Sequence, residues 1–162
     1  MDSSPLPTHA KKDDRTWVAL THERLDLAAV SNFLYHPRAG GVDIFSGTTR
    51  QWTGSGETAK ETVELSYECY EMMAIQEMQA LLDEAIGKWP VVRGCLLHRL
   101  GIVPVAEASV VIGIATPHRG DAFEACRFLI DQLKIQVPIW KKEHYSDGKK
   151  EWVMGKGKPE VK

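Results

Sequence analysis

Ser109–Ala115 reads SVVIGIA, and this almost wholly apolar stretch falls within a strand predicted from Ala108 to Ala115. A strand without polar alternation needs cover on both of its faces. Another strand, Val91–Leu100, is predicted just before it along the chain. The sequence therefore predicts a sheet that is packed on both faces at this point.

Three segments around these strands show helical periodicity. Apolar residues recur every three to four positions, and a proline soon afterwards prevents each helix from continuing. The predicted helices are Leu25–Leu34, Met72–Trp89 and Asp121–Lys134, and the prolines are Pro37, Pro90 and Pro138.

Shorter segments predict the remaining strands. Trp17–Leu20 and Val42–Arg50 read as strands, residues 51–60 as a polar loop, and Ile139–Val153 as a hairpin. Val63–Tyr70 alternates, with Val63, Leu65, Tyr67 and Cys69 expected on one face. Strands and helices alternate without a glycine-rich nucleotide fingerprint. This order predicts a two-layer α+β sandwich with a mixed, mainly antiparallel sheet and a small β-hairpin subdomain.

Length and composition predict a single domain. The chain has 162 residues, of which 43% are hydrophobic, and this is enough to bury one core. Residues 1–14 are polar and proline-containing and are expected to form a disordered leader. The domain is expected over residues 15–154, followed by a flexible tail over residues 155–162.

Charge and hydropathy exclude several classes of protein. The formal net charge of -2 argues against nucleic-acid binding, which usually needs a strongly basic surface. No apolar run approaches 18 residues, and the N-terminus lacks the apolar core of a secretory signal. We therefore expect a cytosolic protein with neither a nucleic-acid nor a membrane partner.

The cysteines and histidines do not form a recognisable metal or disulfide pattern. Cys69, Cys95 and Cys126 are odd in number and far apart, which is typical of reduced thiols in the cytosol. The six histidines show no ligand spacing, so no metal is expected. The chain also lacks a phosphate-binding nucleotide loop and a Gly-x-Ser-x-Gly elbow, which disfavours nucleotide hydrolysis and serine esterase chemistry.

The candidate site begins at the corner Lys134–Glu143, KIQVPIWKKE. Pro138 forces the chain out of the helix there, so Lys134 and Lys141 flank a sharp turn. Two ammonium groups at such a corner can bind an anion, or move protons if burial lowers their pKa. The alternative is that both lysines are solvated surface residues, which is the more common case for lysine.

Two further basic elements stand at segment ends. Arg50 lies where a strand becomes a loop, and His118 and Arg119 lie where a strand meets a helix. The free amides at a helix start favour anions. With the lysine corner, these residues predict an acidic small-molecule substrate. His98 and Arg99 also end a strand, but we interpret them as structural because they lead directly into a turn.

Several motifs between residues 40 and 153 resemble the large, catalytic subunit family of molybdopterin synthase. They are Phe45–Arg50 (FSGTTR), Lys88–Pro90 (KWP), His98–Gly101 (HRLG), Ala115–Arg119 (ATPHR) and Lys134–Glu143. Pro138–Glu143 (PIWKKE) is the strongest of them. The resemblance implies a hammerhead-like form of the α+β sandwich and makes residues 15–154 the catalytic domain.

The resemblance also implies an activity and its partners. The large subunits form a central homodimer within a heterotetramer, and each binds a small ubiquitin-like subunit with a Gly-Gly thiocarboxylate C-terminus. Sulfur passes from that C-terminus to cyclic pyranopterin monophosphate and forms the molybdopterin dithiolene. The reaction needs no cofactor.

Carried over by position, the resemblance implies roles for seven residues. Lys134 and Lys141 match the essential lysines, with proton transfer and charge stabilisation as their expected work. The implied substrate-binding residues are Arg50, His118, Arg119, Lys142 and Glu143.

Some positions depart from the family pattern. Thr48 stands where bacterial members often have a lysine, and the loop over residues 51–60 is longer than in compact members. Lys156 is the match for a basic residue that is sometimes contributed to the neighbouring subunit's pocket.

Two other functions fit the sequence. The chain could be a non-catalytic adaptor that binds a ubiquitin-like protein through a basic pocket, or a regulatory domain that senses an anionic metabolite. Only the enzyme would produce a dithiolene.

Overall fold

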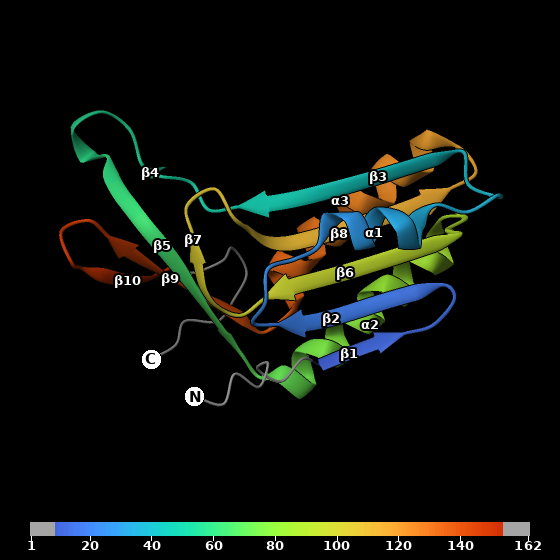
Figure 1. Ribbon diagram of the computed structural model, residues 1–162, viewed down its shortest axis with the longest axis horizontal. Coiled ribbons are helices and arrows are strands. Elements are labelled where there is room, and N and C mark those ends of the chain that lie inside the picture. Colours follow the sequence, from blue (N-terminus) through green and yellow to red (C-terminus); the bar gives the residue numbers. More distant parts are fainter. Residues whose placement is uncertain (1–8, 154–162) are drawn as a thin grey trace.

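The computed structural model describes residues 9–153, and its framework is a five-stranded sheet in the order β1-β2-β6-β8-β3 (Figure 1). β2 and β6 run parallel, and the other neighbouring pairs in this sheet are antiparallel. This arrangement confirms the prediction of a mixed, mainly antiparallel sheet. The strands are β1 (His9–Lys12), β2 (Thr16–Thr21), β3 (Gly41–Thr48), β6 (Arg93–Arg99) and β8 (Ala108–Thr116).

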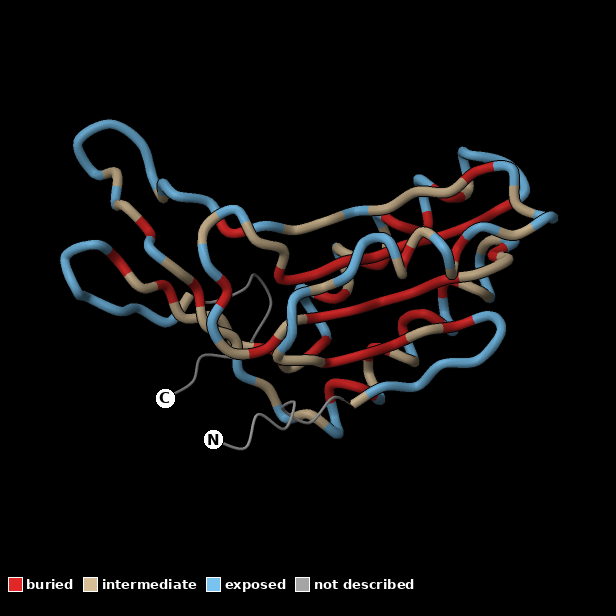
Figure 2. Tube along the Cα trace, in the orientation of Figure 1, coloured by how far each residue is buried: buried red, intermediate tan, exposed pale blue. Residues whose placement is uncertain are grey.

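The apolar stretch in β8 is covered on both faces, as its sequence predicts. Val110, Ile112 and Ile114 belong to one core cluster, whereas Val111 and Ala115 belong to another on the opposite face. Figure 2 shows β2, β6 and β8 as the most continuously buried strands. The centre of the sheet therefore separates two hydrophobic cores.

Three helices supply the cover. α2 (Glu71–Lys88) and α3 (Arg119–Gln136) pack on one face, and the short α1 (Leu27–Leu34) packs on the other (Figure 1). The Asp26 side chain caps α1 by accepting a hydrogen bond from the Ala29 amide at 3.1 Å. A side chain at Gly113 would collide with Leu34, so glycine in β8 lets α1 approach the sheet closely.

A second sheet extends beyond the first and contains the predicted hairpin (Figure 1). Its strand order is β10-β9-β5-β4, and β7 also pairs with β5. The strands are β4 (Trp52–Thr53), β5 (Lys60–Cys69), β7 (Gly101–Pro104), β9 (Ile139–Tyr145) and β10 (Lys150–Val153). The second sheet is less buried than the first, as Figure 2 shows.

Several local features differ from the sequence predictions. β1 lies inside the expected leader, and its antiparallel pairing with β2 makes residues 9–12 part of the first sheet. β7 forms in a segment that was expected only to connect two strands. The loop over residues 51–60 contains β4 and one turn of 3-10 helix, Gly56–Thr58, and folds back onto β5.

A bulge in β5 also changes the predicted strand faces. The register with β9 shifts between Thr62 and Glu64, and Val63 is 51% exposed although Leu65 is buried. Val63 therefore leaves the buried face that simple alternation assigns to it.

Candidate active site

A cavity of about 970 Å³ lies where the second sheet meets the first sheet and the C-terminal end of α3. Arg50, Lys134, Lys141 and Glu143 all line it. Four of the seven residues that the sequence singled out are thus brought together, although they come from separate parts of the chain. Apolar and polar residues complete the lining, among them Phe45, Leu65, Tyr67, His98, Ser109, Ile130 and Ile139.

The proline corner forms as predicted and places both lysines at this cavity. α3 ends at Gln136, and the Val137 amide closes its last turn by donating to the Leu133 carbonyl at 3.1 Å. Pro138 follows, and β9 begins at Ile139. Lys134 therefore comes from the last turn of the helix and Lys141 from the strand that leaves the corner.

Lys141 has the most perturbed environment of the site lysines. Burial lowers the pKa of Lys141 below its ordinary value, because the cavity removes water from the ammonium group. The positive charges of Lys134 and Arg50 lower this pKa further, whereas the negative charge of Glu143 raises it. Such a group can exchange a proton more readily than a solvated lysine.

Glu143 is a buried carboxylate on the same face of β9 as Lys141. It accepts a hydrogen bond from the Tyr145 hydroxyl at 2.7 Å, and this bond is the largest cause that raises the pKa of Tyr145. Tyr145 also reaches Glu151 of β10 at 3.2 Å. The Glu143 side chain is therefore held in one orientation at the edge of the cavity.

Lys142 does not line the cavity of this chain, although it was predicted among the substrate-binding residues. Successive side chains of a strand point to opposite faces, so Lys142 leaves β9 on the side away from Lys141. Its ammonium nitrogen lies over the Trp152 ring, 4.4 Å from the ring centroid.

His118 and Arg119 are also absent from the cavity lining of this chain. They stand exposed at the start of α3, whereas Lys134 is in its last turn. Lys134 lies fifteen positions after Arg119, which corresponds to about 22 Å along a helix axis. Within one chain these two residues are too far away to act with Lys141. Lys156, the other basic candidate, lies outside the described residues.

Several polar residues of the lining were not predicted as site residues. Among them are Tyr67, His98 and Ser109, of which His98 and Ser109 are buried. The alternation in β5 did place Tyr67 on the same face as Leu65, but nothing in the sequence showed that this face borders a cavity. His98 was interpreted as structural because its strand ends in a turn.

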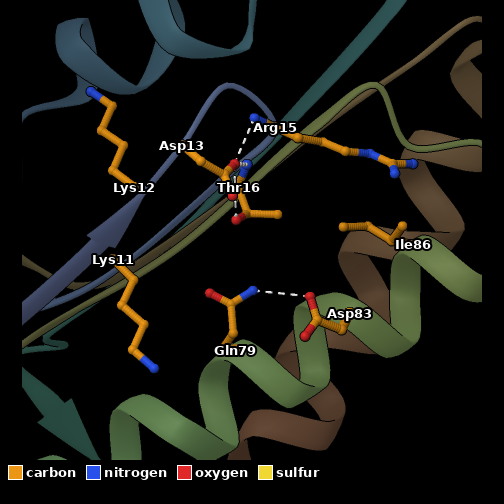
Figure 3. A pocket seen from close by; sticks show the side chains of 8 residues that line it. All are labelled: Lys11, Lys12, Asp13, Arg15, Thr16, Gln79, Asp83 and Ile86. Carbon is orange, nitrogen blue, oxygen red and sulfur yellow. Dashed lines mark hydrogen bonds between the residues drawn. The ribbon is translucent and has the colours of Figure 1, made fainter.

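A second hollow, of about 660 Å³, lies between β1 and α2 (Figure 3). Its polar groups largely satisfy one another: Gln79 donates to Asp83 at 3.0 Å, and Asp13 accepts from the Arg15 and Thr16 amides. The Arg15 guanidinium donates to the Val91 carbonyl. Lys11 and Lys12 also line this hollow, and the Lys12 ammonium lies over the Trp17 ring, 4.2 Å from the ring centroid.

Residues 9–153 contain no group of three or more histidine, cysteine or acidic side chains placed to hold a metal ion. No helix within these residues has the length and hydropathy needed to cross a membrane. Cys69, Cys95 and Cys126 are free thiols, and burial raises the pKa of Cys95 to about 12.

Comparison with known proteins identifies relatives over most of the chain. A family model described as MoaE protein matches residues 20–136. A molybdopterin synthase catalytic subunit from Culex quinquefasciatus is 45% identical over 139 residues, which cover 84% of this chain and 86% of that protein. The corresponding protein of Halalkalibacterium halodurans is 38% identical over 135 residues and covers 83% of each chain.

Solved structures give the same result for the fold. A molybdopterin synthase structure from Staphylococcus aureus matches with a TM-score of 0.76 and 33% identity, over 83% of this chain and 94% of that one. A chain from a complex of subunits 1 and 2 of molybdopterin-converting factor from Helicobacter pylori has a TM-score of 0.69 at 21% identity, over 88% and 93% of the two chains. These matches confirm the predicted hammerhead-like architecture, and the chain belongs to the MoaE protein family.

Proposed function

We propose that this chain is the catalytic subunit of a molybdopterin synthase and acts as a sulfurtransferase. Its donor is the thiocarboxylated C-terminus of a small ubiquitin-like subunit, and its acceptor is cyclic pyranopterin monophosphate. In each transfer the donor's sulfur replaces an oxygen of the pterin side chain: the C–S bond at the donor's terminal carbonyl and a C–O bond of the side chain break, and a C–S bond to the side chain forms. The displaced oxygen leaves as water or on the opened phosphate, and water restores the donor's carboxylate. Two transfers complete the dithiolene.

The observation that carries this proposal is the lowered pKa of Lys141 inside a cavity that it shares with Arg50 and Lys134. A cyclic phosphate needs cationic partners, and the Arg50 guanidinium can provide charge-assisted hydrogen bonds. Opening the phosphate ring and releasing an oxygen needs a proton donor beside developing negative charge. We assign this work to Lys141 and Lys134, and we assign to Glu143 the orientation of Lys141.

The proposed partner is supported by the relatives. The Helicobacter pylori structure is described as a protein–protein complex of two subunits of molybdopterin-converting factor. We propose the same kind of assembly for this chain, with one small subunit bound to each copy and its C-terminus entering the cavity.

We further propose that two copies of this chain form the central homodimer, so that His118 and Arg119 of one copy reach the cavity of the other. The distance along α3 supports this arrangement, because these residues cannot act with Lys141 of their own chain. The cations for the phosphate would then come from two chains.

Mixing two inactive variants tests the shared site. If Lys141→Ala and Arg119→Ala chains are unfolded together and reassembled, half of the dimers combine both chains, and each such dimer has one intact site. Activity should return to about a quarter of the wild-type value for a two-fold symmetric pair. Reassembled mixtures that stay as inactive as either variant would contradict a site built from two copies.

Reconstitution tests the activity itself. The chain, a thiocarboxylated small subunit and cyclic pyranopterin monophosphate should together yield the dithiolene, and omission of any component should prevent it. Binding of the small subunit without any dithiolene would instead identify a non-catalytic adaptor. Stabilisation by the pterin alone, with no product when the small subunit is added, would identify a metabolite sensor.

A further inference from the structure

The position of Lys141 relative to Lys134 and Arg50 depends on how the two sheets are joined. Lys134 lies on α3, which packs against β3 and β8, and Arg50 follows β3, so both belong to the body built on the first sheet. Lys141 belongs to β9 of the second sheet. A small shift of one sheet against the other would therefore change the distance between Lys141 and the other two cations.

Tyr67 is the residue of β5 that stands directly opposite Lys141 in the second sheet. Directly opposed side chains on one face of a sheet have their Cβ atoms about 5 Å apart. Tyr67 and Lys141 both line the cavity, so the tyrosine ring forms the wall beside the lysine stem. Any movement of Tyr67 is passed to Lys141 through this pairing.

The Tyr67 side chain contacts two strands of the first sheet, and Ser109 links it to a third. Its hydroxyl donates to Ser109 Oγ of β8 at 3.2 Å, and Ser109 donates in turn to the Gly47 carbonyl of β3 at 3.3 Å. Its ring meets the His98 ring of β6 edge to face, with the centroids 4.9 Å apart. One side chain of the second sheet is thus held by β3, β6 and β8 together.

Another link between the sheets lies away from Lys141. The Thr49 hydroxyl donates to the Val103 carbonyl of β7 at 3.3 Å, and this contact fixes β7 beside the end of β3. β7 pairs with β5 on the side opposite to β9. The Tyr67 contacts therefore lie on the Lys141 side of the junction, where Val137 and Ile139 are also buried in the core of the first sheet.

We infer that Tyr67 is a positioning residue for the proposed sulfur transfer, and that its hydroxyl bond to Ser109 holds Lys141 at its working distance from Lys134 and Arg50. This inference rests on the proposed function for its catalytic meaning. Its physical content, the placement of Lys141 by the Tyr67–Ser109 bond, can be measured without any substrate.

The test removes the bond from each side. Tyr67→Phe keeps the ring and deletes the hydroxyl, and Ser109→Ala deletes the acceptor. In each variant the Lys141 pKa, followed by NMR of ¹³C-labelled lysine with Lys141→Arg for assignment, should rise toward its ordinary value as water reaches the loosened site. In the reconstituted reaction kcat should fall about tenfold with KM little changed, which is the order expected for a sub-ångström misplacement.

The double variant and a control separate positioning from general damage. Both substitutions remove the Tyr67–Ser109 bond, and Ser109→Ala also removes the bond to the Gly47 carbonyl. Because the first bond is shared, the double variant should lose no more than the worse single variant. Tyr35→Phe is the matched control, since Tyr35 is 65% exposed and lies at the end of α1, and it should leave both readouts unchanged. If Tyr67→Phe misfolds, Ser109→Ala still tests the bond.

Two results would overturn the inference: a wild-type Lys141 titration in Tyr67→Phe and Ser109→Ala, whatever the value of kcat, or losses of the two single variants that multiply in the double variant. A failure of the proposed function is distinguishable from both. In that case the wild-type chain forms no dithiolene, while the Lys141 titration in the chain alone still decides whether Tyr67 positions this lysine.

Discussion

The two faces of the second sheet are built from the same strands but differ in chemistry. On the cavity face, Lys141 and Glu143 are desolvated and act on each other electrostatically. On the outer face, Lys142 lies over Trp152, and His144 bridges Glu64 and Ser66. Adjacent residues of one strand thus have different tasks. A candidate catalytic lysine is therefore distinguished by its burial beside other charges rather than by its residue type.

The largest effect is expected when Lys141 on the cavity face is replaced and its neighbour Lys142 on the outer face serves as the control. Lys141→Ala should lower dithiolene formation at least about 100-fold, because it removes the proposed proton donor and a cation beside the developing charge. Lys142→Ala, the matched control on the outer face, should stay within about twofold of wild type. The effect of each variant is measured as product formation in a single turnover, with the small subunit at a saturating concentration. Equal losses in the two variants would mean that the faces do not differ in function.

A smaller effect is expected at Glu143, which raises the pKa of its neighbour. Glu143→Gln removes that negative charge, so the pKa of Lys141 should fall further below its ordinary value. The pKa of Tyr145 should fall as well, because its hydrogen bond to the carboxylate is the main cause of its rise. Product formation should drop about tenfold, the equivalent of one hydrogen bond to a charged group.

NMR titration of the two side chains checks the direction of both shifts. Tyr70→Phe serves as a control, since Tyr70 is exposed and is not in the cavity lining. A Lys141 pKa that rises in Glu143→Gln would contradict the electrostatic coupling described for the cavity face.

The smallest effect is expected on the outer face and concerns stability alone. His144 Nε2 lies 3.1 Å from Ser66 Oγ, and His144 Nδ1 lies 3.0 Å from Glu64 Oε1. His144→Ala removes both contacts and should lower the free energy of unfolding by about 1–2 kcal/mol, with product formation retained. Urea unfolding and the reconstituted assay measure the two quantities. A loss of activity without a loss of stability would place His144 in the reaction.

Most of the fold could be predicted from prolines and apolar periodicity, because both determine structure within a short segment of the chain. Pro90 and Pro138 end their helices wherever the rest of the chain lies, and the SVVIGIA strand needs two covered faces in any fold. The bulge beside Val63 was missed because a register shift depends on the partner strand β9. β1 was missed because its strand character comes from pairing with β2.

The candidate site was predicted in part for the same reason. The corner at Pro138 brings Lys134 and Lys141 close through local geometry, and strand alternation puts Glu143 with Lys141. The family resemblance grouped Lys142 with Lys141 and Glu143 in one motif. Alternation along β9 nevertheless directs the Lys142 side chain to the opposite face. Tyr67 and Ser109 form their hydrogen bond only because the two sheets pack together. This packing cannot be predicted from a local pattern of residues.

The most direct test of the account is a crystal structure of the chain bound to cyclic pyranopterin monophosphate. We expect the pterin to lie in the cavity between the sheets, with the Lys141 ammonium within hydrogen-bond distance of the substrate and Arg50 beside its phosphate. Substrate bound on the outer face of the second sheet, near Lys142 and Trp152, would contradict it.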